Sequence, residues 1–217
     1  MNTPFENEPK ILAWKRLVAE AGSAIRSLNP IAVLRKKNGD LLFALVDAEI
    51  SAADGQPLPR YLFVRGDACL IVPFIRNRDT GEAKFLMIRQ NRIGSGGLSL
   101  EFPAGMLDNE VADPRKVALR ELAEETGLTV GDNELFPLCT KKLFSSVGAS
   151  DEGIYYFGCT LEVGTVAWQS LCSGIHGNPD ENEKISLVLL SRAEAEAEAT
   201  SLQVFLGFNL FEAHRPK

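Results

Sequence analysis

A short helix with clustered carboxylates is the feature that most constrains what this chain can form. The aspartate–proline pair at residues 113–114 begins it, because aspartate accepts first-turn amide hydrogens and proline is tolerated there. Gly127 ends it, since glycine readily takes the left-handed conformation of a helix C-terminus. Between these signals Glu121, Glu124 and Glu125 share one helix face, with neighbouring Cβ atoms roughly 5–6 Å apart.

Three like charges on one helix face repel one another, and near the C-terminus they also oppose the helix dipole. Taken alone, the triplet is more typical of a solvated stripe, because glutamate is a good helix former. The alternative is that a cation lies against it. Carboxylate oxygens suit Mg²⁺ or Mn²⁺, which keep several waters and so leave room for phosphate oxygens.

The flanking sequence favours the cation. Residues 101–107 read EFPAGML and precede the helix, and residues 120–128 read RELAEETGL. A loop that ends in Pro103-Ala104-Gly105 can present backbone carbonyls, and glycine lets the chain approach a ligand closely.

These residues resemble the motif of the Nudix hydrolase family, which runs Gly, five free positions, Glu, seven free positions and then R-E-U-x-E-E-x-G-U, with U aliphatic. The second half matches fully at residues 120–128. The first half differs, because Glu110 comes one place early and the spacing from Gly105 to Arg120 is one residue too long. The role of Glu110 is therefore left open.

A second resemblance, over roughly residues 60–191, narrows the branch. Arg65-Gly66, the RQNR segment at 89–92, EFPAGML and the segment 173–183 are similar to those of ADP-ribose and ADP-sugar diphosphatases. The resemblance implies an α/β fold of mixed α+β type, an αβα sandwich with a mixed sheet. It also implies a small N-terminal helix and antiparallel sheet that contribute to a dimer interface and to substrate binding.

The resemblance also implies the site. Glu121, Glu125 and Glu124, with the carbonyl of Ala104, would hold two or three Mg²⁺ ions that bridge the substrate diphosphate, and Glu183 would be a further ligand. Glu181 would be the general base, and Glu121 and Glu125 would act with it in catalysis. Arg92 is expected to contact a phosphate, because a guanidinium offers fixed, charge-assisted donors, although a solvent-facing arginine at a strand end is nearly as common. Arg120 is expected to orient a metal-binding glutamate.

The predicted reaction is metal-dependent hydrolysis of a nucleoside diphosphate sugar to a nucleoside monophosphate and a sugar phosphate. ADP-sugar or ADP-ribose is favoured on the resemblance alone, because no aromatic pair can be assigned to the base: Tyr61, Phe63 and Phe74 could all be core. A GDP-hexose such as GDP-mannose, a free nucleoside triphosphate and a non-catalytic Nudix-like nucleotide-binding module are the alternatives. The chain keeps all three glutamates, which such modules often lose.

Composition limits the partners and the location. The chain has 217 residues, of which 45% are hydrophobic and 24% charged, as in soluble globular proteins. A net charge of −6 disfavours a broad nucleic-acid surface. No run approaches the roughly 18 apolar residues of a membrane span, and the first residues lack the order of a secretory signal. We therefore expect a cytoplasmic protein with Cys69, Cys139, Cys159 and Cys172 as reduced thiols. The resemblance adds that it would be a homodimer acting on a small molecule.

Two domains are predicted, an N-terminal piece at 1–66 and a Nudix hydrolase domain at 67–217. Apolar spacing indicates a helix from Pro9 to Leu28, ended by Asn29-Pro30. The remaining predicted elements are a hairpin of 31–36 and 41–50 around Asn38-Gly39, buried strands from Tyr61 and around KFLMIRQ, strands at 135–144, 152–161 and 185–191, and a helix that begins at Ser191 with a capping box to Glu194.

Overall fold

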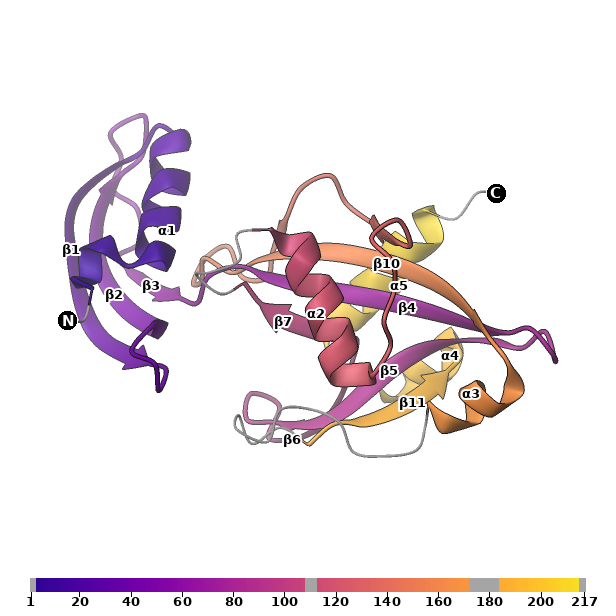
Figure 1. The fold of residues 1–217 in the computed structure, drawn as a ribbon. Coiled ribbons are helices and arrows are strands. Elements are labelled where there is room, and N and C mark those ends of the chain that lie inside the picture. The colour runs from indigo at the N-terminus through magenta and orange to yellow at the C-terminus, as the bar shows by residue number, and fades with distance from the viewer. Residues whose placement is uncertain (1–2, 108–112, 172–183, 215–217) are drawn as a thin grey trace. The chain divides into compact units, whose positions relative to one another are not determined.

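The computed structural model describes residues 3–107, 113–171 and 184–214. The chain divides into two compact units (Figure 1). The first consists mainly of residues 1–68 and 143–154, and the second mainly of residues 69–106, 113–142 and 155 onward. Each unit is described in turn.

The first unit is a three-stranded sheet with one helix. Its elements are η1 (Phe5–Asn7), α1 (Pro9–Glu20), β1 (Ala24–Arg35), β2 (Leu41–Ser51), β3 (Tyr61–Val64) and the short β9 (Leu143–Phe144). The sheet order is β1-β2-β3, with antiparallel pairs. The predicted hairpin around Asn38-Gly39 is confirmed, and Gly39 has a φ of 95°, which suits the tight turn.

The predicted helix from Pro9 to Leu28 is wrong in its second half. The helix ends at Glu20, Gly22 turns the chain with a φ of 73°, and β1 begins at Ala24. The Asn29-Pro30 pair therefore lies inside a strand. A register shift beside Pro30 and the edge position of β1 accommodate a residue that cannot donate a hydrogen bond to the ladder.

The core of the first unit lies between α1 and the sheet. Ile11 packs there with buried residues of β2 and β3, including Ala44, Val46 and Val64. The adjacent charges are matched: Arg35 Nη1 donates to Glu8 Oε1 at 2.6 Å, and Lys10 Nζ donates to the carbonyl of Leu42 at 2.8 Å. Burial of Glu8 and Lys10 is tolerable because each has such a partner.

The second unit is built on a larger sheet. Its strands are β4 (Ala68–Asn77), β5 (Ala83–Arg92), β6 (Gly97–Glu101), β7 (Ala104–Met106), β8 (Leu135–Pro137), β10 (Gly153–Val163) and β11 (Ser186–Leu190). The order is β11-β5-β4-β10-β8, with β6 beside β5, β7 beside β4, and β9 beside β10. The helices are α2 (Pro114–Thr126), α3 (Thr165–Ser170), α4 (Arg192–Glu198) and α5 (Leu202–His214).

Helices cover both faces of this sheet (Figure 1). On one face Phe85 of β5 contacts Phe208 and Phe211 of α5, with ring centroids 4.8 and 5.5 Å apart. On the other face Ile88 of β5 belongs to an apolar cluster that includes Leu128, just after α2. The predicted αβα sandwich is confirmed, whereas α3 and α5 were not predicted.

The end signals of α2 and α4 are confirmed. Asp113 Oδ1 accepts the amide hydrogen of Arg115 at 3.0 Å, and Gly127 has a φ of 71°. In α4 the capping box is complete, with Ser191 and Glu194 each accepting the other's backbone N–H. The strands predicted at 135–144 and 152–161 are shorter or shifted, as β8, β9 and β10.

Two further expectations concern thiols and membranes. Cys69, Cys139 and Cys159 are free, and Cys172 lies outside the described residues. In the part of the chain that the structure describes, no helix combines the length and apolar character needed to cross a membrane.

Candidate active site

The carboxylate of Glu125 is buried against the loop before α2. Glu125 is only 4% exposed, and its Oε2 accepts the backbone N–H of Ala104 at 3.0 Å. The amide of Ala104 thus holds a carboxylate that helix periodicity alone would leave at the surface. The helix and the EFPAGML segment form one site at this contact.

Glu121 lies even closer to the same loop. A Cβ built on Gly105 would be 2.1 Å from Glu121 Cδ, so a side chain at residue 105 would displace the carboxylate of Glu121 from this position. Arg120 Nη2 donates to Glu121 Oε1 at 2.9 Å, which agrees with the predicted orienting role of Arg120. The carboxylate of Glu121 therefore lies between the main chain at Gly105 and the guanidinium of Arg120.

The donors here fit a hard divalent cation. Glu121 and Glu125 offer carboxylate oxygens, and Glu124, one residue earlier than Glu125, is exposed. Among the described residues no group of three His, Cys, Asp or Glu side chains could hold a metal by itself. Two carboxylates completed by main-chain, water and phosphate oxygens are what Mg²⁺ accepts, because it keeps several waters and binds through one or two carboxylates.

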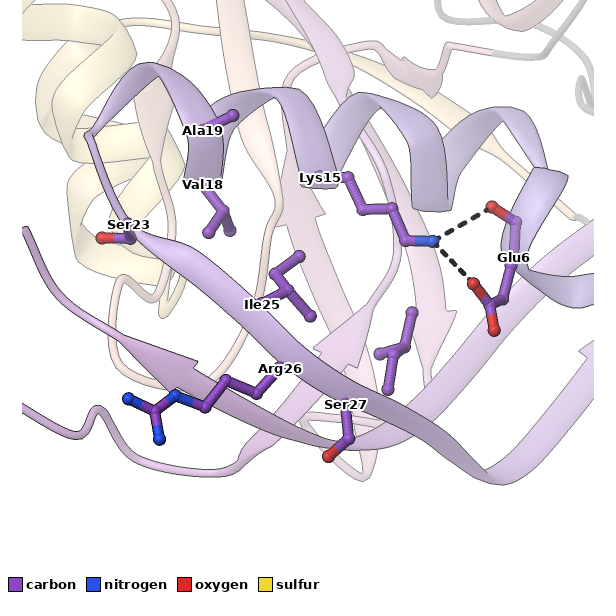
Figure 2. A pocket seen from close by; sticks show the side chains of 9 residues that line it. Glu6, Lys15, Val18, Ala19, Ser23, Ile25, Arg26 and Ser27 are labelled. Carbon is purple, nitrogen blue, oxygen red and sulfur yellow. Dashed lines mark hydrogen bonds and ion pairs between the residues drawn. The ribbon is translucent and has the colours of Figure 1, made fainter.

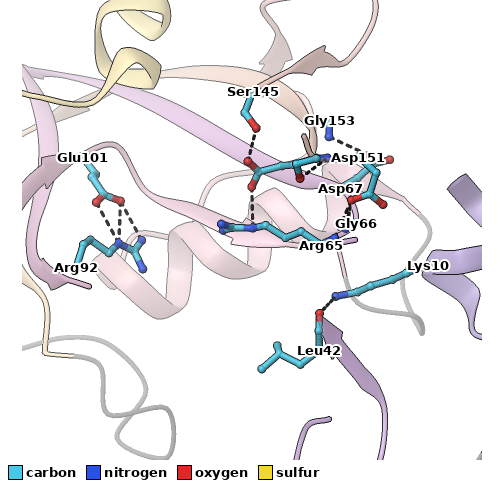
Figure 3. A network of polar contacts seen from close by, with 12 residues as sticks. Lys10, Leu42, Arg65, Gly66, Asp67, Arg92, Glu101, Ser145, Asp151 and Gly153 are labelled. Atoms are coloured by element: carbon cyan, nitrogen blue, oxygen red, sulfur yellow. Dashed lines mark hydrogen bonds and ion pairs between the residues drawn. The ribbon is translucent and has the colours of Figure 1, made fainter. Parts of the chain in front are cut away.

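Arg92 ends β5 and pairs with the first residue of the EFPAGML segment. Its Nε and Nη2 both donate to the carboxylate of Glu101, at 3.0 to 3.2 Å and 2.9 Å (Figure 3). In the β5–β6 register Ile88 faces Glu101 and Arg92 faces Gly97, so these residues share one face of the sheet. That is the face covered by α2. The structure thus puts Arg92 on the glutamate side of the sheet, in an ion pair rather than pointing freely into solvent.

Sequence reasoning missed Gln90 and the role of Glu101. Gln90 faces Ser99 across the β5–β6 pair, between the pairs that contain Glu101 and Arg92. Both Gln90 and Ser99 are buried. Gln90 follows Leu86 and Ile88 at alternate, inward-facing positions of β5, and this was the available signal, because buried glutamine is uncommon.

The carboxylates of the loop at 145–152 contact groups within the first unit. Glu152 accepts the hydroxyl hydrogen of Ser145 at 2.6 Å and forms an ion pair with Arg65 at 2.8 Å, although the Nε–H direction falls outside hydrogen-bond geometry (Figure 3). Asp151 Oδ1 accepts the amide hydrogens of Arg65 and Gly66 at 2.7 and 3.1 Å. These contacts hold the loop to the segment before β4.

The pKa of Asp151 is raised, mainly because burial disfavours its charged form and secondarily because Asp67 is near, while the two amide hydrogen bonds act in the opposite direction. Burial likewise raises the pKa of the Cys69 thiol to about 12. Cys69 is thus a neutral core thiol and not a nucleophile of the site.

Three predicted residues cannot be placed. Glu181 and Glu183, predicted as base and ligand, and Glu110, whose role was left open, lie outside the described residues. The aromatic candidates differ from one another: Phe74 is buried, whereas Tyr61 and Phe63 are exposed. The three are therefore not all core residues.

A cavity of about 380 Å³ lies elsewhere, between α1 and β1 in the first unit (Figure 2). Its apolar wall includes Val18 and Ile25, and its one carboxylate, Glu6, pairs with Lys15 at 3.1 Å. It contains none of the predicted site residues. The carboxylates of α2 and the EFPAGML segment meet in the second unit instead.

Two known proteins resemble this chain in sequence over more than half of its length. It is 27% identical over 165 residues to "Nudix hydrolase 14, chloroplastic" of Arabidopsis thaliana, covering 73% of this chain and 53% of that protein. It is 35% identical over 141 residues to "ADP-ribose pyrophosphatase" of Escherichia coli (strain K12), covering 63% of this chain and 60% of that protein. The chain thus spans somewhat more than half the length of these relatives.

A solved structure described as "Crystal structure of ADP compounds hydrolase" has the same fold, with a TM-score of 0.61, 18% sequence identity and coverage of 88% of this chain and 92% of that one. The family model of the NUDIX domain matches residues 66–205. This match includes the EFPAGML segment, the glutamates of α2 and the Arg92–Glu101 pair. Since it covers more than half of the chain, the protein belongs to the Nudix family.

Proposed function

We propose that this protein hydrolyses the diphosphate of a nucleoside diphosphate sugar, with ADP-ribose or an ADP-sugar preferred. The products would be a nucleoside monophosphate and a sugar phosphate. The observation that carries the proposal is the contact of buried Glu125 with the N–H of Ala104, beside Gly105 and Glu121. Relatives described as ADP-ribose pyrophosphatase and a fold neighbour described as an ADP compounds hydrolase support the choice of substrate.

The cofactor in this proposal is Mg²⁺, with Mn²⁺ as a substitute. Glu121, Glu125 and Glu124, the carbonyl of Ala104 and Glu183 would hold it. When bound, the cation supplies positive charge to the diphosphate and makes a water molecule a better nucleophile. Glu125 is oriented for this by the Ala104 amide, and Glu121 by Arg120 and by the absence of a side chain at residue 105.

Other residues act on the substrate and on the water. Arg92 would donate its N–H groups to a phosphate oxygen, for which its planar guanidinium is well suited. Glu181 would accept a proton from the attacking water. Glu181→Gln should then lower turnover with little change in KM, whereas weakened metal affinity would show that Glu181 is a ligand instead.

A substrate panel tests the proposal. Purified protein is incubated with ADP-ribose, ADP-glucose, GDP-mannose and nucleoside triphosphates, with Mg²⁺ or with a chelator, and phosphatase-released phosphate is measured. We expect turnover of the ADP compounds that the chelator abolishes. Inactivity on every compound, with an intact thermal transition, would favour a nucleotide-binding module. Preference for nucleoside triphosphates or for GDP-mannose would agree with a Nudix hydrolase and would refute the proposed preference for ADP compounds.

We also propose that two copies associate through the first unit. On the sheet face opposite α1, Leu45 pairs with Phe63, and both are exposed together with Leu34 and Tyr61. An apolar face of this kind is typical of an interface. Leu45→Glu should convert a dimer to a monomer in sedimentation experiments, while Leu12→Glu, which alters a similarly exposed leucine on α1, should not. A wild-type monomer would refute this.

A cytoplasmic location and a small-molecule partner complete the proposal. The free thiols of the described cysteines are consistent with a reducing compartment, and the net charge of −6 does not favour a nucleic-acid partner. Microscopy of the tagged full-length protein tests the location.

A further inference from the structure

We propose that Gln90 is a positioning residue. When Arg92 turns to the substrate, the side-chain N–H of Gln90 donates a hydrogen bond to the carboxylate of Glu101 in place of Arg92. The inference deepens the proposed function and rests on it, because it assigns Arg92 to the diphosphate. It concerns one face of the β5–β6 hairpin, on which three alternate residue pairs of the ladder lie.

The register puts Gln90 beneath the ion pair. Along this face the pairs are Ile88 with Glu101, Gln90 with Ser99, and Arg92 with Gly97. Arg92 and Glu101 belong to the two outer pairs, yet their side chains meet. The ion pair therefore spans the central pair, whose residues Gln90 and Ser99 are only 4% and 5% exposed.

The amide of Gln90 has an unused donor. Its Nε2 is buried and has no hydrogen-bond partner among the described residues. A buried donor without an acceptor costs free energy, so its retention needs an explanation. Glu101 is the diagonal neighbour of Gln90 across the strand pair, a separation that long side chains can bridge.

The two members of the ion pair are not equivalent. The Arg92 side chain is 40% exposed and the Glu101 side chain 18%. Arg92 is thus the more exposed member and the one that can reach a ligand, whereas Glu101 stays partly buried. If Arg92 leaves, the remaining carboxylate must gain another donor or bear a desolvation penalty. The N–H of Gln90 is the donor within reach, and this exchange lowers the cost of releasing Arg92.

A double-mutant cycle on thermal stability tests the contact without substrate. Gln90→Met removes the amide and keeps the length of the side chain. In the wild-type protein we expect the melting temperature to change by less than about 1 °C or to rise, because the donor is unused there. In an Arg92→Ala background the same change should lower it by about 3 °C or more, because Gln90 is then the partner of Glu101. Equal effects in both backgrounds would overturn the proposal.

Kinetics provide the second readout and do not depend on whether Arg92→Ala folds. Gln90→Met alone should raise KM for ADP-ribose about tenfold, as expected for one lost hydrogen bond to a charged group, with kcat within about twofold. Asn91→Ala, which changes the exposed neighbouring amide on the opposite face, is the control and should leave both constants unchanged. An unchanged KM in Gln90→Met would refute the exchange.

The two proposals fail separately. If wild-type protein hydrolyses no nucleoside diphosphate sugar, the proposed function is refuted. The double-mutant cycle on melting temperature still tests whether Gln90 contacts Glu101. If wild-type protein is active while both Gln90 readouts are flat, only the role of Gln90 fails.

Discussion

Two buried glutamates of this protein, Glu125 on α2 and Glu152 beside β10, have different surroundings. Glu152 is matched by a guanidinium at 2.8 Å and a hydroxyl at 2.6 Å. Glu125 is held by the N–H of Ala104, and its neighbours on the helix are two further glutamates. Both residues are less than 10% exposed.

In the function proposed above, this difference separates a structural carboxylate, Glu152, from one that binds a cation, Glu125. The charge of Glu152 is already compensated by a side chain of the same unit, so its contacts fix the loop. Glu125 accepts the main-chain N–H of Ala104, and Glu121 is paired with Arg120 beside Gly105. In the function proposed above, these two carboxylates also bind the cation. Burial and residue type alone would not distinguish the two.

The largest effect is expected for Glu125→Gln. Loss of a residue that only supports a metal ligand costs 10–100-fold, so loss of a ligand should lower kcat/KM by more than about 100-fold. The amide retains an oxygen that can accept from Ala104, and the melting temperature should change little. Steady-state kinetics with Mg²⁺ and a thermal melt measure both, and Glu162→Gln, on the exposed end of β10, is the control. A loss below about tenfold would contradict the metal role.

Gly105→Ala should be the next most severe change. The added methyl would overlap Glu121 Cδ, so Glu121 or the loop must move. We expect activity to fall by about tenfold or more because the carboxylate of Glu121 is displaced, whereas the melting temperature should change little because only the end of a flexible side chain has to move. Gly148→Ala is the control, because an added Cβ there meets no atom within 4 Å and Gly148, like Gly105, does not have a positive φ. Full activity of Gly105→Ala would show that Glu121 need not hold this position.

Glu152→Gln should lower stability rather than rate. The substitution removes the charge that faces Arg65, and because that arginine is 41% exposed the cost should be modest, about 2–4 °C in melting temperature. Glu162→Gln, at a 3.9 Å surface pair, should change it by less than about 1 °C. If Glu152→Gln instead abolished activity at full stability, the contrast with Glu125 would not hold.

The smallest effect is the pH dependence of Asp151. The pKa of Asp151 is raised in the folded state, so the folded protein binds a proton at this carboxylate more tightly than the unfolded chain does. Its contribution to stability is therefore most favourable at acid pH and is lost as the pH rises through the folded pKa.

Asp151→Asn should for this reason raise the melting temperature at pH 7 by about 1–3 °C, since one amide oxygen can still accept both N–H groups. The gain should shrink towards pH 4. Melts of both proteins across this range measure it, and destabilisation at pH 7 would show that the carboxylate charge is needed there.

Local features of the site could be predicted from the sequence. The Asp113 cap, Gly127 and the spacing of Glu121, Glu124 and Glu125 follow from rules that involve only neighbouring residues. The N-terminal helix shows where such rules fail. Ile25 and Leu28 continue the helical spacing of the residues before them, but Gly22 and the pairing of β1 with β2 put them in a strand.

Long-range contacts could not be predicted in this way. The partner of Arg92 is nine residues away in sequence, across a hairpin, and that of Glu152 is Arg65, at the end of a different strand. Nothing in the residue types shows that the first pair covers Gln90 or that the second fixes a loop.

The sequence alone thus determined the family motif, the helix that bears it and the chemistry of its oxygen donors, because these depend on side-chain type and helical periodicity. Only the tertiary structure decided that Ala104 orients Glu125, that Gly105 makes room for Glu121 and that a glutamine lies under the Arg92–Glu101 pair. The reason is physical: burial and hydrogen bonding depend on which distant segments meet, and that is settled by the packing of the whole sheet.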